Sequence, residues 1–185
     1  MKKREADDNE LIAAVQNGDK TAMRMLVEKY KRKAYFLAIG MVGNSDEAYD
    51  ISQEAFIRVF RSAGKFDQGQ RFFPWFYAII ANLCKDALHR RQRRESQEVD
   101  IAENEFLLVD EGNPETKMIK EEEVRNLRRA LMKLGFEDRE IIMLKHFRDL
   151  SYDEIASTLG IPKGTVMSRL YYARRKLAKL MHEIN

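Results

Sequence analysis

The chain has one cysteine, three prolines and no long apolar run, and these scarcities exclude several classes of protein. A single cysteine, Cys84, excludes an internal disulfide and fits a reducing compartment. The N-terminus carries Lys and Arg without the apolar stretch of a signal peptide, and no apolar run has the length needed to span a membrane. We therefore expect a cytoplasmic protein with no membrane insertion.

Residues that carry catalytic or metal chemistry are equally sparse. The three histidines, His89, His146 and His182, are scattered without the spacing of metal ligands. The sequence shows neither a nucleophile–base pair nor a glycine-rich phosphate loop. We therefore expect no catalytic residue, no metal, no cofactor and no enzymatic activity.

The charge distribution divides the chain. Charged residues make up 34%, glycine and proline are few, and no strand-like alternation is present, so we expect an all-α fold. Residues 96–116 contain seven acidic residues and no Lys or Arg. Removing these seven charges from a net charge of +3 leaves +10 on the remainder. The sequence predicts two small helical domains, 1–95 and 117–185, joined by an acidic linker over 96–116. Two basic domains of this kind favour bipartite binding of nucleic acid.

Residues 150–177 have the pattern of a helix-turn-helix. Ser151 is a good N-cap, Gly160 can end the first helix in the left-handed conformation, and Thr165 is expected to cap the second helix. One face of the second helix is apolar, and the opposite face carries Met167, Ser168, Tyr171, Arg174, Arg175 and Lys179. A solvated helical hairpin is the alternative. The short turn and the basic face together favour DNA binding.

A helix capped by Ser45 is predicted in the first domain, with a buried face of Ala48, Ile51, Ala55, Val59 and Phe60. Its outer face carries Asp50, Gln53, Glu54, Ile57, Arg58 and Arg61. Periodicity alone favours a solvated face over a protein interface at these positions.

The segment that follows combines aromatic rings with arginines. Phe76 shares a helical register with Ile79, Ile80 and Leu83, which indicates a place in the core. Phe72, Trp75 and Tyr77 cannot all point inward with it, so exposed rings are expected beside Arg90, Arg91, Arg93 and Arg94. Exposed rings stack on unpaired bases at about 1–3 kcal/mol each, and guanidinium groups contact phosphates. The segment therefore predicts binding to single-stranded or opening DNA, with Asn82 available to a splayed base.

Three segments in order resemble the bacterial RNA polymerase sigma factors of the extracytoplasmic function (ECF) group, in the sigma-70 family. Residues 46–61 resemble the helix that binds the polymerase clamp, residues 75–91 the segment that recognises and melts the −10 element, and residues 150–177 the −35 recognition domain. The resemblance covers nearly the whole chain. It implies a factor that binds core RNA polymerase, directs promoter-specific initiation and aids strand opening, with an anti-sigma factor as a further partner.

The resemblance also implies roles for individual residues. Contacts with polymerase would come from Asp50, Gln53, Glu54 and Arg58. The −10 element would meet Lys65, Phe72, Trp75, Tyr77, Asn82, Arg90, Arg91, Arg93 and Arg94. The −35 element would meet Lys163, Thr165, Met167, Ser168, Arg169, Tyr171, Tyr172 and Arg175.

Two positions depart from the family pattern. Ala78 stands where the family often has Arg, which removes one phosphate contact. Met167 stands where Lys or Arg is frequent, and methionine can pack against a thymine methyl but cannot hydrogen-bond guanine. Two other functions remain open at this stage: a helix-turn-helix regulator that is not a polymerase subunit, and an RNA-binding or adaptor protein. The first leaves the aromatic–arginine segment unexplained and the second leaves the helix-turn-helix unexplained.

Overall fold

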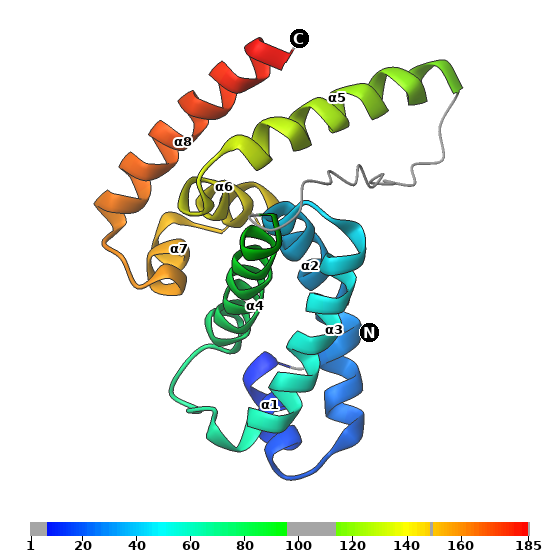
Figure 1. Ribbon diagram of the computed structural model, residues 1–185. Helices are drawn as coiled ribbons and strands as arrows, with labels where there is room; N and C mark the ends of the chain where they lie inside the picture. The colour runs from blue at the N-terminus through cyan, green and yellow to red at the C-terminus, as the bar shows by residue number, and fades with distance from the viewer. Residues whose placement is uncertain (1–6, 96–113, 149, 185) are drawn as a thin grey trace.

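The computed structural model describes residues 7–95, 114–148 and 150–184, and within these ranges the regular structure is helical. Figure 1 shows the helices in two groups, which confirms the prediction of two all-α domains. Residues 96–113 of the predicted linker lie outside the described ranges. The first domain contains α1 (Asp8–Gln16), α2 (Lys20–Val42), α3 (Ser45–Ser62), the short 3₁₀ helix η1 (Ala63–Lys65) and α4 (Phe72–Glu95). The second contains α5 (Pro114–Lys133), α6 (Phe136–Arg148), α7 (Tyr152–Leu159) and α8 (Lys163–Ile184).

Polar side chains and a glycine set the boundaries of α2 and α3. At the start of α2, the carboxylate of Asp19 accepts hydrogen bonds from backbone N–H groups of the first turn. Gly43, at φ 75°, ends the helix in the left-handed conformation that glycine adopts without strain. The side chain of Asn44 then accepts from the N–H of Glu47. Asn44 is therefore the N-cap of α3, and the prediction of Ser45 was wrong by one residue.

Aromatic rings fill the centre of the first domain. The ring of Tyr30 lies 5.4 Å from that of Phe72 and 5.5 Å from that of Phe76, and Phe56 lies 5.1 Å from Phe76. All four side chains are buried, and each contributes about 1.5–3 kcal/mol by leaving water. The predicted core residue Phe60 is instead 52% exposed. At about 100° per residue it points roughly 120° away from Ala48, whereas Phe56 lies closer to the buried face.

The helix-turn-helix forms as predicted around a capping box. Oγ of Ser151 accepts a hydrogen bond from the N–H of Glu154, whose carboxylate accepts one from the N–H of Ser151. Gly160, at φ 65°, ends α7. The second helix begins at Lys163, and the carbonyl of Pro162 accepts from the N–H of Val166. The prediction that Thr165 caps this helix was therefore wrong, because Thr165 already lies in its first turn.

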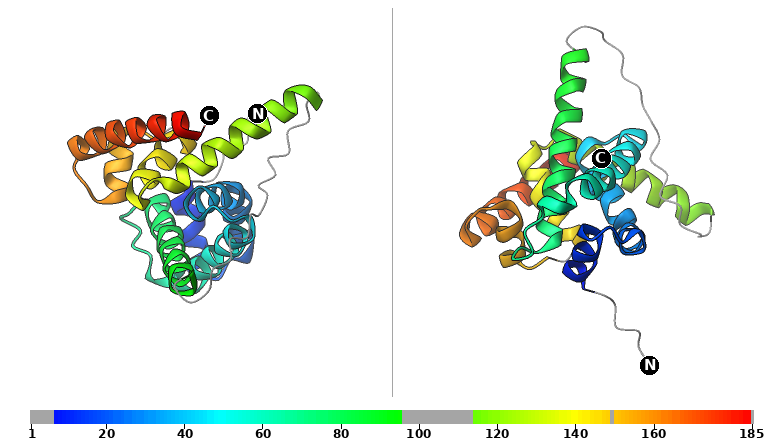
Figure 2. Two further views of the ribbon diagram at one scale, coloured as in Figure 1. Left: turned by 45° about the horizontal axis from the view of Figure 1, so that its top comes forward. Right: turned by 90° about the horizontal axis from the view of Figure 1, so that it is seen from below.

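The two domains pack against each other. Helix α6 lies on α2, and α7 lies beside α4, as the views in Figure 2 show from two further sides. This contact covers part of the aromatic segment of α4, which is the part of the first domain with a predicted role in DNA binding. Among the described helices, none is both long and apolar enough to cross a membrane.

Candidate functional site

Helix α8 exposes the face predicted to meet the −35 element. Its opposite stripe, Val166, Leu170 and Ala173, is buried in the second domain. Burial of that stripe turns Met167, Tyr171 and Tyr172 to solvent, with exposed fractions of 52%, 56% and 58%. Of the other predicted residues, Lys163, Ser168 and Arg175 are exposed, and Thr165 and Arg169 are half-buried.

Two of the cations on this face pair with carboxylates of the same domain, and a third lies beside an aromatic ring. Lys163 pairs with Asp153 at 2.8 Å, and Arg169 pairs with Glu137 at 3.4 Å. The guanidinium of Arg175 lies 5.8 Å from the centre of the Tyr171 ring. Ion pairs at an exposed surface stabilise a fold by only about 0–1 kcal/mol. These side chains can therefore exchange a carboxylate partner for a phosphate at little cost.

The basic end of α4 forms a second candidate surface. Arg90, Arg91, Arg93 and Arg94 are exposed near the C-terminus of the helix, and Asn82 and Lys65 are also exposed. The structure thus places these predicted −10 residues at the surface, where they can reach a nucleic acid.

The aromatic part of the −10 prediction needs correction. Phe72 and Tyr77 are buried, with exposed fractions of 1% and 2%, and Trp75 is half-buried with its ring 5.0 Å from that of Phe66. The expectation of exposed rings was therefore wrong for Phe72 and Tyr77 in this conformation. Phe72 completes the core of the first domain, whereas the hydroxyl of Tyr77 donates a hydrogen bond to Glu140 of the second domain.

Two residues of α1 hold the loop that leads into α4. The side-chain amide of Asn9 donates to the carbonyl of Gln70 at 2.8 Å and accepts from the N–H of Phe72 at 3.2 Å. The side-chain amide of Gln16 donates to the carbonyls of Ala63 and Phe66 at 2.8 and 2.9 Å. Neither residue was expected from the sequence, because an amide on a helix surface carries no signal of a partner 47 to 63 residues away.

The outer face of α3 carries apolar side chains among its charges. Asp50, Gln53 and Arg58 are exposed, Glu54 is half-buried, and Nε of Arg58 pairs with Glu54 at 3.1 Å. Beside them lie the exposed side chains of Tyr49, Ile57 and Phe60. Large apolar groups gathered on one exposed helix face are typical of a protein interface. The exposure of Phe60 adds to that face a ring that the sequence had assigned to the core.

Two charged residues of α6 are buried at the domain contact. Arg139 and Glu140 have exposed fractions of only 6% and 7%. Burial raises the pKa of the Glu140 carboxyl, which the hydrogen bond from Tyr77 partly opposes. Burial also raises the pKa of Tyr77 well above its ordinary value, and the nearby Glu140 adds to that rise. Neither residue stands out in the sequence, since adjacent Arg and Glu on a helix are usually solvated. Within the described ranges, no cluster of three His, Cys, Asp or Glu side chains is suited to hold a metal ion.

Comparison with known proteins matches both domains. Residues 26–94 match the family described as Sigma-70 region 2, and residues 125–177 match Sigma-70, region 4. The chain is 33% identical over 183 residues to the RNA polymerase sigma-H factor of Pseudomonas aeruginosa, covering 96% of this chain and 95% of the relative. It is 34% identical over 179 residues to the ECF RNA polymerase sigma factor SigW of Bacillus subtilis, covering 94% and 96%. Its fold is similar to that of the sigma factor RpoE of Bartonella quintana, solved with the anti-sigma factor NepR. The TM-score is 0.69 at 22% identity, covering 86% of this chain and 96% of that one.

Proposed function

The chain belongs to the ECF group of the sigma-70 family. On this basis we propose which of its surfaces bind the polymerase and which bind the promoter elements. The protein is a sigma factor: it binds core RNA polymerase and directs promoter-specific transcription initiation, and it is not an enzyme. This excludes both a stand-alone regulator and an RNA-binding adaptor. We assign residues 1–95 to polymerase binding and the −10 element, residues 117–185 to the −35 element, and the acidic residues 96–116 to the linker.

The exposed face of α8 reads the −35 element in the major groove. The observation that carries this assignment is the row of exposed Met167, Tyr171 and Tyr172, flanked by cations, on the second helix of a helix-turn-helix. Met167 favours a thymine at its base pair, because its side chain offers an apolar contact and no hydrogen-bond donor. The other contacts come from Lys163, Thr165, Ser168, Arg169 and Arg175.

Helix α4 and the loop before it bind the −10 element and aid melting. The arginines at the end of α4 contact phosphates, and Asn82 and Lys65 lie exposed for contacts with the separated strand. Trp75 supplies a stacking surface that is already partly exposed, and Tyr77 supplies one once its cover from α6 is removed. Phe72 acts from within the core, by supporting the loop against Tyr30.

The outer face of α3 binds the polymerase. The exposed side chains of Ile57 and Phe60 lie beside the charged side chains of Asp50, Glu54 and Arg58 on this face. Exposed apolar side chains next to charged ones are the usual composition of a specific protein interface. Gln53 adds a neutral hydrogen-bonding group to the same face.

The further partners follow from the family. We assign the protein to the cytoplasm, where polymerase and promoter DNA are found. An anti-sigma factor that covers the basic surfaces would keep the protein inactive. The sigma factor RpoE of Bartonella quintana, which has a similar fold, was solved in complex with an anti-sigma factor, NepR.

The test is run-off transcription by purified core polymerase on a pooled genomic promoter library, with and without this protein. We expect discrete new start sites that share −35 and −10 elements. The absence of new starts, together with failure to bind core polymerase, would overturn the assignment. Starts that survive removal of the arginines of α4 would instead overturn the assignment of that surface.

A further inference from the structure

Met167 presents a thioether side chain to solvent in the first turns of α8. It is 52% exposed, and among the methionine side chains that the structure describes only Met25 of α2 is also exposed, at 46%. Met41, by contrast, is buried with an exposed fraction of 1%. An exposed thioether is open to oxidation to the sulfoxide. Within the described ranges, Met167 and Met25 are therefore the methionines that an oxidant reaches most easily.

The surroundings of Met167 leave this side chain open. A Cβ placed on Gly164, about one helical turn earlier on the same side of α8, would meet no atom within 4 Å. Lys163, four residues before Met167, is held towards α7 by its ion pair with Asp153 at 2.8 Å. A small oxidant can therefore approach Met167 from solvent.

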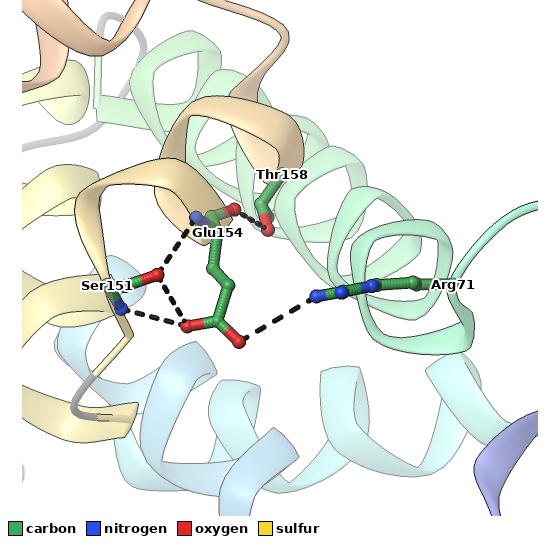
Figure 3. A network of polar contacts seen from close by, with 4 residues as sticks. All are labelled: Arg71, Ser151, Glu154 and Thr158. Carbon is green, nitrogen blue, oxygen red and sulfur yellow. Dashed lines mark hydrogen bonds and ion pairs between the residues drawn. The ribbon is translucent and has the colours of Figure 1, made fainter.

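The support under this part of α8 does not depend on the Met167 side chain. Helix α7, against which α8 packs, is fixed by the capping box that Figure 3 shows, in which the carboxylate of Glu154 accepts from the N–H and the hydroxyl of Ser151 at 2.9 and 2.8 Å. Val166 and Leu170 belong to the buried stripe that holds α8 on the domain. A chemical change at Met167 therefore alters the exposed face of α8 and leaves the fold intact.

Oxidation changes what Met167 can contact in a major groove. The thioether is apolar, and its proposed partner is a thymine methyl. The sulfoxide is polar, and burying its oxygen against a methyl group costs free energy. The donors in the major groove that could satisfy this oxygen are the amino groups of adenine and cytosine. The oxidised side chain therefore loses the contact that favours thymine.

We propose that Met167 is a site of reversible oxidation, and that its sulfoxide lowers the affinity of the protein for the −35 element. The oxidant is a peroxide: the sulfur donates an electron pair to one oxygen of hydrogen peroxide, the O–O bond breaks, and the other oxygen leaves as water. A methionine sulfoxide reductase restores the thioether, with two thiols oxidised to a disulfide and the oxygen released as water. The inference rests on the proposed position of Met167 in the −35 groove.

The test treats the full-length protein with hydrogen peroxide, removes the oxidant with catalase and then adds core polymerase. Trypsin releases Met167 in residues 164–169 and Met25 in residues 25–29, and neither peptide contains another methionine. Mass spectrometry thus follows each site separately. Met167→Leu and Met25→Leu each remove one sulfur and keep an apolar side chain. Burial raises the pKa of the Cys84 thiol to about 12, so this thiol does not compete for the peroxide.

The first readout is the affinity for promoter duplexes that the untreated parent holoenzyme selects from a library with a randomised −35 element. Each variant is compared with its own untreated form. We expect oxidation to lower the affinity of the parent and of Met25→Leu about tenfold, and reductase treatment to restore it. Oxidation should leave the affinity of Met167→Leu unchanged. An equal loss in Met167→Leu, an unchanged affinity of the parent once residues 164–169 carry the sulfoxide, or oxidation of Met25 without Met167 would overturn the proposal.

The second readout separates this proposal from the proposed function. Untreated holoenzyme is exposed to peroxide with and without the selected promoter, and we expect the promoter to slow the oxidation of Met167 severalfold without protecting Met25. If Met167 is oxidised equally in both cases, or if the parent selects no −35 sequence, the proposed role of α8 fails and the inference fails with it. Protection of Met167 by the promoter, without a loss of affinity after oxidation, would overturn the effect of oxidation alone.

Discussion

The side-chain amide of Asn9 is hydrogen-bonded to the backbone on both sides of Arg71, accepting from the N–H of Phe72 and donating to the carbonyl of Gln70. Helix α1 thereby fixes the loop that begins the −10 segment, although α1 itself precedes the region 2 match at residues 26–94. A residue outside the matched region thus positions the loop for which we propose contacts with the −10 element.

Replacing Asn9 with Ala should loosen this loop. We expect the free energy of unfolding to fall by about 1–2 kcal/mol, because the loop backbone loses hydrogen bonds that water only partly replaces. Open-complex formation should fall severalfold while −35 binding is retained. Asn17→Ala is the control, since the Asn17 amide donates to the carbonyl of Ala13 within its own helix turn. Equal effects of the two substitutions on open-complex formation would contradict the role of Asn9.

Ile57→Ser tests the polymerase surface on α3. Ile57 is 43% exposed, so we expect the free energy of unfolding to change by no more than about 0.5 kcal/mol. Affinity for core polymerase, measured by fluorescence anisotropy, should fall about tenfold because the centre of the interface loses an apolar contact. Met25→Ser removes a side chain of similar exposure, 46%, from α2 and should leave the affinity unchanged. If both variants bind like the parent, the interface lies elsewhere.

Met167→Arg should change the base preference at one position of the −35 element. An arginine in the major groove can donate two hydrogen bonds to guanine, a discrimination of about 1–3 kcal/mol. Selection from a randomised −35 library should then recover guanine where the parent recovers thymine. Ala178→Arg adds the same charge about three turns further along α8 and should strengthen binding without changing the preference. A parental preference in the Met167 variant would place this residue outside the groove.

Cys84 should make the fold sensitive to alkali. Burial raises the pKa of its thiol from an ordinary value near 9 to about 12, so the folded state retains a proton that the unfolded chain loses. The thiol therefore contributes stability that is fully present below about pH 9 and is lost as the pH rises towards about 12. Urea unfolding at a series of pH values should show this decline, and Cys84→Ala should make it shallower. Rapid alkylation of the native thiol near pH 8 would contradict its burial.

Local patterns in the sequence determined where the helices form and which of their faces are exposed to solvent. The capping box of Ser151, the left-handed Gly160 and the apolar stripe of α8 involve residues within a few turns of each other, and the resulting exposed face of α8 was predicted correctly. The same holds for the exposure of the arginines of α4. Such features depend on helical periodicity and capping, which act over a few residues.

Only the tertiary structure decided which aromatic rings are exposed and which are buried. Tyr77 and Glu140 lie 63 residues apart. The amphipathic pattern of α4 therefore contains no information on the burial of Tyr77 by another domain. Phe60 was wrongly assigned to the core for a related reason. It and Phe56 both lie near the edge of the buried face of α3, and the packing of Phe76 selects Phe56 for the core. Periodicity specifies the direction in which a side chain points, whereas burial depends on which distant segment arrives there. The sequence of this chain therefore indicates which helix faces are candidates for DNA binding, whereas the packing of the two domains determines which residues of those faces are covered.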